Sequence, residues 1–251
     1  MTTPLHGASI ERRDRVDALR GLAIVWMALF HFAFDLNHFG LLAPRQNFYT
    51  DPFWTGQRSA IVSLFVFTAG LSQAIAFEAS QSWQRFWRRW AQIAVCALLV
   101  SAGSALMFPR SWISFGILHG LALMLIVTRC SAPLGGRWLW PLGLAAILLP
   151  HWLAHPAFDV PWLQWTGFVT KKPVTEDYAP LLPWLGVMLW GCAAGRWLLG
   201  RRPDILAGGV PRGVRSLAAL GRWSLSFYML HQPVLIGLLL AWRGIVGSAG
   251  A

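Results

Sequence analysis

The stretch from Asp17 to Gly40, DALRGLAIVWMALFHFAFDLNHFG, is an apolar segment that favours a helix. It contains one arginine near its start and three ionisable side chains toward its end: Arg20, His31, Asp35 and His38. The spacings of four and three residues place the last three side chains on one helical face. Ionisable groups in an apolar span normally face a protein interior or a wet cavity, and they are usually functional. The segment therefore predicts a membrane-spanning helix that carries a catalytic site.

The overall composition indicates an integral membrane protein. The 251 residues are 56% hydrophobic and only 12% charged, where a soluble domain carries roughly twice that share of charge. Several of the 16 tryptophans flank apolar runs, as in an interfacial aromatic belt. The net charge of +11 comes from arginines in short loops without a continuous basic face, so no nucleic acid partner is expected. The three cysteines are scattered and form no zinc pattern, and no metal is expected.

Seven apolar runs are long enough to cross a bilayer, and together they predict an all-α, polytopic helical bundle. The predicted spans are residues 18–36, 59–77, 90–108, 112–128, 138–154, 181–199 and 223–242. Residues 1–16 lack an apolar core and a cleavage site, so we expect no cleaved signal peptide. No internal repeat or second composition class is visible, which predicts one domain over residues 1–251.

The basic residues predict the orientation of these spans. If the N-terminus is cytoplasmic, fifteen of the 21 lysines and arginines fall on the inner side. This excess follows the positive-inside rule and predicts an inner N-terminus and an outer C-terminus. Arg20 then lies at the cytoplasmic end of the first span, with His31 roughly 16 Å further along the helix axis and His38 close to the outer face.

This geometry suits acid–base chemistry inside the membrane. Histidine titrates near neutral pH, and a carboxylate one turn away, such as Asp35, can fix the tautomer of His31. An anionic donor could be held by Arg20 while His31 accepts a proton. The alternative is that His31 hydrogen-bonds a neighbouring span and acts as structural glue.

Five short motifs occur in a characteristic order along the chain. They are Asp17-Ala-Leu-Arg20-Gly21 with His31, Phe65-Val-Phe-Thr-Ala-Gly-Leu-Ser72, Phe115-Gly-Ile-Leu-His119, Asp177-Tyr-Ala-Pro-Leu-Leu-Pro-Trp-Leu-Gly186 and Ser224 through Tyr228 to His231-Gln-Pro233. The first motif resembles the first-span signature of membrane acyltransferases that O-acetylate surface sugars. The whole set resembles more closely the bacterial relatives of the heparan-alpha-glucosaminide N-acetyltransferase catalytic domain.

The resemblance implies an acyltransferase in a bacterial-type inner membrane. Acetyl-CoA would supply the acetyl group from the cytoplasm, and a sugar-type acceptor at the outer face would receive it. His31 would be a general base or a transient acyl carrier, with Asp35 and His38 as its companions. The lysosomal enzymes place their catalytic histidine nearer the position of Asp51, so the choice between His31 and His38 stays open. The lipid bilayer and a glycoconjugate are the expected partners, and a second copy of the chain, in a homodimer, is a further candidate.

The basic turn before the third span is the candidate donor site. Arg85 and Arg88 form an Arg-x-x-Arg pair, as in the acyltransferases, and Arg89 follows directly. Together with Arg20 they could bind the pyrophosphate and 3'-phosphate of coenzyme A. The alternative is that they serve only as a positive-inside topology signal.

Four further residues are candidates for the acceptor side. His119 could face the same cavity as His31, and Asp177 and Tyr178 could line the acceptor entrance on an outer loop. His231 could also contact substrate. The alternatives are helix capping by Asp177 and a structural role for His231 next to Pro233.

A transporter is the second hypothesis, because intramembrane histidines and prolines also line transport pathways. No inverted repeat supports it. The arginine-rich inner edge is better suited to a phosphate-bearing donor.

Overall fold

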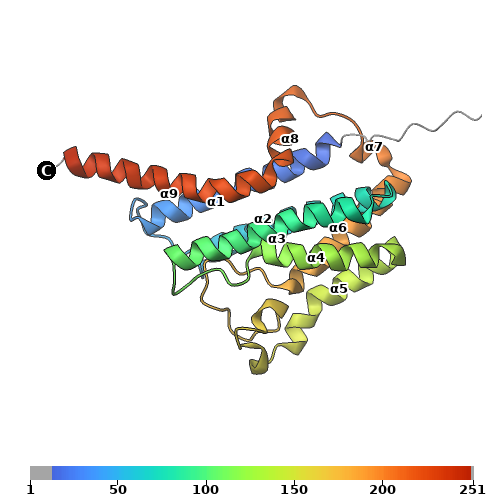
Figure 1. Cartoon of the computed structure of the whole chain (residues 1–251), viewed down its shortest axis with the longest axis horizontal. Helices are drawn as coiled ribbons and strands as arrows, with labels where there is room; N and C mark the ends of the chain where they lie inside the picture. The colour runs from blue at the N-terminus through green and yellow to red at the C-terminus, as the bar shows by residue number, and fades with distance from the viewer. Residues whose placement is uncertain (1–12, 250–251) are drawn as a thin grey trace, which may run out of the picture.

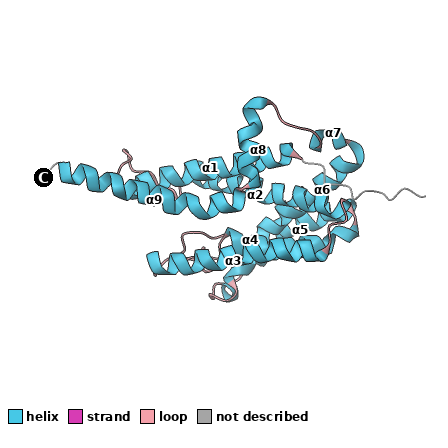
Figure 2. Ribbon diagram, turned by 45° about the horizontal axis from the view of Figure 1, so that its top comes forward, coloured by secondary structure: helices cyan, strands magenta, loops and turns pink. Residues whose placement is uncertain are grey.

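The computed structural model describes residues 13–249, and within this range the chain consists of helices and loops without a strand (Figure 2). The α-helices are α1 (Asp14–His38), α2 (Pro52–Glu78), α3 (Trp83–Met107), α4 (Ile117–Ser131), α5 (Gly136–Leu153), α6 (Leu181–Arg201), α7 (Pro203–Leu206), α8 (Arg215–Arg222) and α9 (Ser224–Ala249). The all-α prediction is confirmed. The predicted single domain, residues 1–251, stays a prediction, and its ends at 1–12 and 250–251 lie outside the described residues.

Five helical segments of this range are long and apolar enough to cross a membrane. They are Asp14–His38, Pro52–Glu78, Trp83–Met107, Ile117–Leu134 and Ser224–Ile245. The chain is thus a multi-pass membrane protein, but a count of seven spans is not confirmed. α5 and α6 coincide with two predicted spans and are 18 and 21 residues long. Their prolines, tryptophans and arginines dilute the apolar content, which explains why they fall outside this set.

The fourth predicted span, 112–128, starts too early. Residues 112–116 form a loop, and α4 begins at Ile117 after an extended Gly116. The N–H of Ile117 donates to the carboxylate of Asp177, at 2.8 Å. This contact comes from a loop 60 residues away and fixes the start of α4. Local apolarity therefore could not predict where the helix begins.

Large apolar side chains remain exposed on the long helices, as expected where lipid is the solvent. On α3 the exposed set includes Leu98, Leu99 and Leu106, and on α9 it includes Leu238. Exposed apolar surface of this extent marks a membrane or interaction face, and here it covers helices of membrane-spanning length.

α1, the first helix, packs against helices from both the N-terminal and the C-terminal part of the chain. It packs against α2, α8 and α9, while α2 packs against α6 and α6 against α5. Figure 1 shows α9 running beside α1 and extending past its end, with α4 and α5 on the opposite side of the bundle. The C-terminal helix is therefore brought onto the first span, where the ionisable stripe lies.

Glycines allow the closest of these helix contacts. A Cβ added at Gly70 on α2 would lie 2.1 Å from the backbone oxygen of Met188 on α6. A Cβ at Gly21 on α1 would lie 2.0 Å from the backbone oxygen of Leu217 on α8. Small residues at such interfaces are typical of membrane helices, where packing rather than hydrophobic exclusion drives association.

Replacing Gly191 with alanine should destabilise the α2–α6 pair. The added Cβ would lie 2.2 Å from the backbone oxygen of Phe67, and overpacking of this kind costs about 1–3 kcal/mol. Thermal unfolding of the purified protein in detergent measures the effect as a lower Tm.

Gly103→Ala is the matched control, because a Cβ at this position on α3 meets no atom within 4 Å. Alanine at an open helical position is favoured by up to about 1 kcal/mol, so the Tm should stay unchanged or rise. An equal loss of Tm in both variants would contradict the close α2–α6 contact.

Candidate active site

Arg20 is held by hydrogen bonds to two other helices and to its own. Its Nη1 donates to the carboxylate of Asp17, at 2.8 Å, and to the backbone oxygen of Gly221, at 3.3 Å. Its Nη2 donates to Ser72 Oγ, at 2.6 Å, and Ser72 in turn donates to the backbone oxygen of Thr68. The first two family-like motifs, around Arg20 and Ser72, are thus joined directly. The guanidinium is fixed in place, and 21% of the Arg20 side chain stays exposed.

The arginines of the predicted donor site lie in the first turns of α3. Ser82 caps the helix by accepting from the N–H of Arg85. The side chains of Arg85 and Arg88 are exposed and make no hydrogen bond to another described residue. Arg89 donates to Gln92, at 3.0 Å, and its charge lies near enough to Arg20 for the two to repel. This places Arg20 near one of the three α3 arginines.

Two arginines at other helix ends have structural partners instead. Arg129 is buried, donates to the backbone oxygen of Gln81 and lies 5.2 Å from the ring centroid of Trp83. Arg196 donates to the backbone oxygen of Ala132 and pairs with Glu78. Cations near the carbonyl ends of helices are stabilising, so these two side chains secure helix ends.

His31 pairs with His231 of α9. Nδ1 of His31 lies 2.7 Å from Nε2 of His231, and the two ring planes are 18° from parallel with centroids 5.0 Å apart. Nδ1 of His231 lies 2.7 Å from the backbone oxygen of Tyr228. His231 is buried and His31 is half-buried. The predicted substrate-binding histidine is therefore the direct partner of the predicted catalytic one.

Asp35 does not hydrogen-bond His31, contrary to the predicted one-turn contact. Its two carboxylate oxygens accept from Nε2 of Gln232, at 3.0 and 3.3 Å, and its side chain is buried. The side chain of Gln232 also lies against His31. Because α9 runs beside α1, it supplies a partner to both His31 and Asp35, and Gln232 connects Asp35 to the histidine pair.

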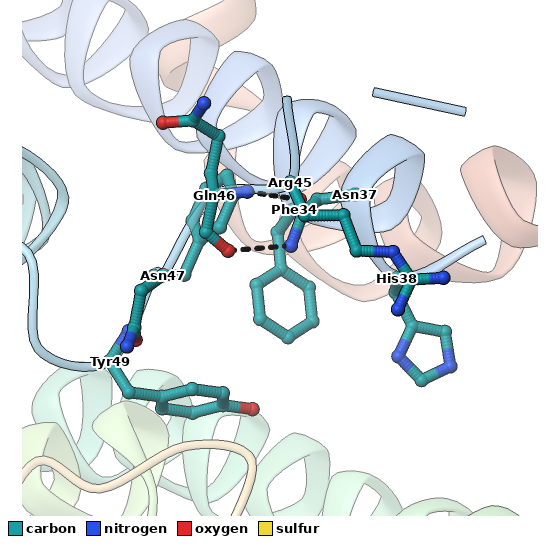
Figure 3. Close-up of a pocket in the computed structure, with 8 residues that line it drawn as sticks. Phe34, Asn37, His38, Arg45, Gln46, Asn47 and Tyr49 are labelled. Carbon is teal, nitrogen blue, oxygen red and sulfur yellow. Dashed lines mark hydrogen bonds between the residues drawn. The ribbon is translucent and has the colours of Figure 1, made fainter. Parts of the chain in front are cut away.

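His38 lies apart from this pair, at the C-terminal end of α1. It is exposed and stacks on Phe34. A cavity of about 390 Å³ opens there between α1 and the loop that follows (Figure 3). Asn37 and Gln46 hold the loop against the helix through two hydrogen bonds of 2.9 and 2.7 Å. The lining residues are Phe34, Asn37, His38, Arg45, Gln46, Asn47, Phe48 and Tyr49.

The ring nitrogens of His119 are both engaged near the start of α4. Its Nδ1 accepts from the N–H of Gly116, at 3.2 Å. Its Nε2 lies 3.1 Å from Ser101 Oγ, whose own proton goes to the backbone oxygen of Ile113. The described contacts of His119 are thus separate from those of His31, and they brace the loop before α4.

Asp177 and Tyr178 also have structural partners. Asp177 accepts from the N–H of Ile117 and so caps α4. Burial raises the pKa of Asp177, opposed by that hydrogen bond and by the nearby positive charge of Lys172. Tyr178 donates to the backbone oxygen of Gln164, at 2.7 Å, and burial raises the pKa of its phenol to about 12. Both side chains order the loop between α5 and α6.

The chain matches the family model described as "Heparan-alpha-glucosaminide N-acetyltransferase, catalytic" over residues 12–233. It belongs to this family. The match covers most of the chain, confirms the resemblance seen in the motifs and favours the enzyme over the transporter alternative. Comparisons with curated proteins and with solved structures gave no match. Acetyl-CoA is the donor that the family implies in general.

The segment matched to the N-acetyltransferase family contains both members of the histidine pair and ends at Pro233. The sequence had singled out the late Ser-x-x-Tyr-x-x-His-Gln-Pro motif but gave Gln232 no role and did not connect His231 to His31. The adjacent polar residues His231 and Gln232 in that motif were the available sequence signal for a contact with the polar residues of α1. Among the described residues, no three metal-ligating side chains form a group.

Proposed function

We propose that this protein moves an acetyl group from cytoplasmic acetyl-CoA to a hydroxyl or amine of a sugar-type acceptor at the outer face of a bacterial-type inner membrane. One observation carries the proposal. Arg20 and His31 project from the same helix, the first near Arg89 of α3 and the second in a pair with His231. An anion-binding group and a proton acceptor thus follow each other along α1.

The proposed orientation puts the N-terminus inside and all seven predicted spans across the bilayer. The excess of fifteen out of 21 basic residues on that side supports it. α5 and α6 would complete the bundle, because α6 packs on α2 and α5 packs on α6. Arg20 then faces the cytoplasm, and His31 lies between it and the outer cavity beside His38.

Coenzyme A would bind at the inner end of α3. Arg85 and Arg88 have no competing partners among residues 13–249, and they stand in the first turns of a helix whose N-terminus itself attracts phosphate. Arg89 and Arg20 would contact the end of the donor nearer to the thioester. Guanidinium groups suit such a ligand because they bind phosphate oxygens with two parallel hydrogen bonds.

His31 would act as general base or as transient acyl carrier. As base, it takes the proton of the acceptor while the new acetyl bond forms and the C–S bond breaks, and the thiolate leaves as coenzyme A. As carrier, it attacks the thioester itself and passes the acetyl group on. Asp35 would hold Gln232 beside the pair, and His38 would lie nearer the acceptor.

The outer cavity is the proposed acceptor site. Its lining combines an exposed Tyr49 with the polar groups of Arg45, Asn47 and His38, a mixture of apolar faces and hydrogen-bonding groups that fits a sugar. His119, Asp177 and Tyr178 would support this side by ordering the loops around it.

Replacing Arg85 and Arg88 together with glutamine should weaken acetyl-CoA binding. Each charge-assisted hydrogen bond lost costs about 1.5–3 kcal/mol, which corresponds to a rise in Kd of at least roughly tenfold. Binding of acetyl-CoA to the purified protein in nanodiscs, titrated at fixed salt, measures the change.

The double variant Arg201→Gln/Arg212→Gln is the matched control. It removes two exposed charges that the same orientation places inside but that lie outside α3. We expect its Kd to stay near that of the parent protein. Unchanged affinity in the Arg85/Arg88 variant would contradict a role in donor binding and would leave these residues only a role in setting the membrane topology.

His31→Ala should insert normally, still bind acetyl-CoA and lose acetyl transfer. Loss of a general base typically costs 10²–10⁴-fold in rate, whereas a structural histidine would lower protein yield more than turnover. The assay is transfer of labelled acetyl from acetyl-CoA to envelope fractions. His38→Ala is the comparison: if it abolishes transfer while His31→Ala stays active, the outer histidine carries the chemistry.

A further inference from the structure

We infer that His231 is a positioning residue that holds His31 in its Nδ1–H tautomer, so that the Nε2 lone pair of His31 is the reacting atom. This inference rests on the proposed function and adds to it the identity of the atom and the route of the proton. It is carried by a chain of two hydrogen bonds across α1 and α9.

The chain of hydrogen bonds has a fixed direction when both rings are neutral. The backbone oxygen of Tyr228 can only accept, so Nδ1 of His231, 2.7 Å away, carries the proton of that ring. Nε2 of His231 is then a lone pair. Nδ1 of His31 lies 2.7 Å from it and must donate. The second nitrogen of His31, Nε2, is therefore left without a proton.

The comparison with His119 shows that this arrangement is specific. His119 receives the N–H of Gly116 at Nδ1 and donates from Nε2 to Ser101. Its tautomer is therefore the opposite one, and no basic nitrogen is left over. His31 keeps a basic nitrogen because His231 on α9 accepts a hydrogen bond from its Nδ1 and leaves its Nε2 unpaired by that contact.

The surroundings of the pair accommodate the added proton. When His31 Nε2 gains a proton, the Nδ1 proton can move along the hydrogen bond to Nε2 of His231, so both rings share the charge. Phe227 stacks on His231 with ring centroids 6.0 Å apart and planes 6° from parallel. A cation at that distance over an aromatic face is stabilised.

Gln232 adds a second stabilising group. Its amide oxygen is buried and accepts no hydrogen bond from the described residues, although its side chain lies against His31. A buried oxygen without a donor is costly. Positive charge on the neighbouring histidine pair would interact favourably with this oxygen and offset the cost of burying it without a donor.

The same proton path serves both proposed chemistries. With His31 as base, the acceptor's O–H or N–H proton goes to Nε2 as the acetyl bond forms, and the departing thiolate later takes a proton back. With His31 as carrier, Nε2 bonds to the acetyl carbon, the C–S bond breaks, and the Nδ1 proton passes to His231. In either case His231 exchanges a proton with His31 alone and does not touch the reacting atoms.

The test is the protonation state of each ring nitrogen, read by NMR of the full-length protein with ¹⁵N-labelled histidines in nanodiscs. His31→Ala and His231→Ala assign the signals. In the parent protein we expect His31 to carry its proton on Nδ1 and to have an unprotonated Nε2, with a coupling between Nδ1 of His31 and Nε2 of His231. A proton on Nε2 of His31 in the neutral state would overturn the inference.

Two variants of His231 supply the functional readout. His231→Ala should lower kcat by roughly 10²-fold or more, since a wrong tautomer disables a base, and should leave the Kd for acetyl-CoA unchanged. His231→Gln should restore much of the rate, because its amide oxygen can accept from Nδ1 of His31. His151→Ala, an exposed histidine on α5, is the control and should behave as the parent protein.

The two proposals can fail separately. If the parent protein transfers no acetyl group but His31 shows the Nδ1–H tautomer, the proposed function fails and the pairing stands. If transfer requires His31 but His231→Ala keeps the parent kcat, or glutamine is no better than alanine at position 231, the positioning role is wrong and the proposed function stands.

Discussion

A polar side chain inside an apolar span needs a partner from another helix, and α1 meets this requirement at three successive levels. Arg20 reaches Ser72 on α2 and the backbone oxygen of Gly221 on α8. His31 reaches His231 and Asp35 reaches Gln232, both on α9. Because unpaired polar groups cost several kcal/mol in hydrocarbon, these contacts fix both the position of α9 and the rotation of α1 about its axis. The candidate site is a consequence of the same contacts.

Glycines make this arrangement possible by letting the helix backbones touch. Gly21 and Gly221 bring α8 against the start of α1, and this closeness places the carbonyl of Gly221 within reach of Arg20. Gly70 and Gly191 do the same between α2 and α6. The glycines of the Arg-Gly and Ala-Gly-Leu-Ser motifs thus act through packing, while the neighbouring Arg20 and Ser72 act through their hydrogen bond.

The sequence predicted the helices and the polar stripe but not the partners of the stripe. Periodicity within α1 correctly put His31 and Asp35 on one face, and a one-turn contact between them followed as the natural expectation. The actual partners are His231 and Gln232, about 200 positions away, and no local pattern specifies that α9 runs beside α1. For the same reason the capping of α4 by Asp177 was one of two open alternatives. The span count depended on α5 and α6, whose prolines, tryptophans and arginines make local apolarity a weak guide.

We propose above all that α1 carries acetyl transfer from an inner donor site to an outer acceptor. Sealed membrane vesicles of opposite orientation test it most directly. With labelled acetyl-CoA supplied in the outside medium, inside-out vesicles, which expose the cytoplasmic face, should acetylate acceptors trapped in the lumen. Sealed right-side-out vesicles should transfer nothing until they are made leaky. Transfer in sealed right-side-out vesicles and none in inside-out ones would contradict the account.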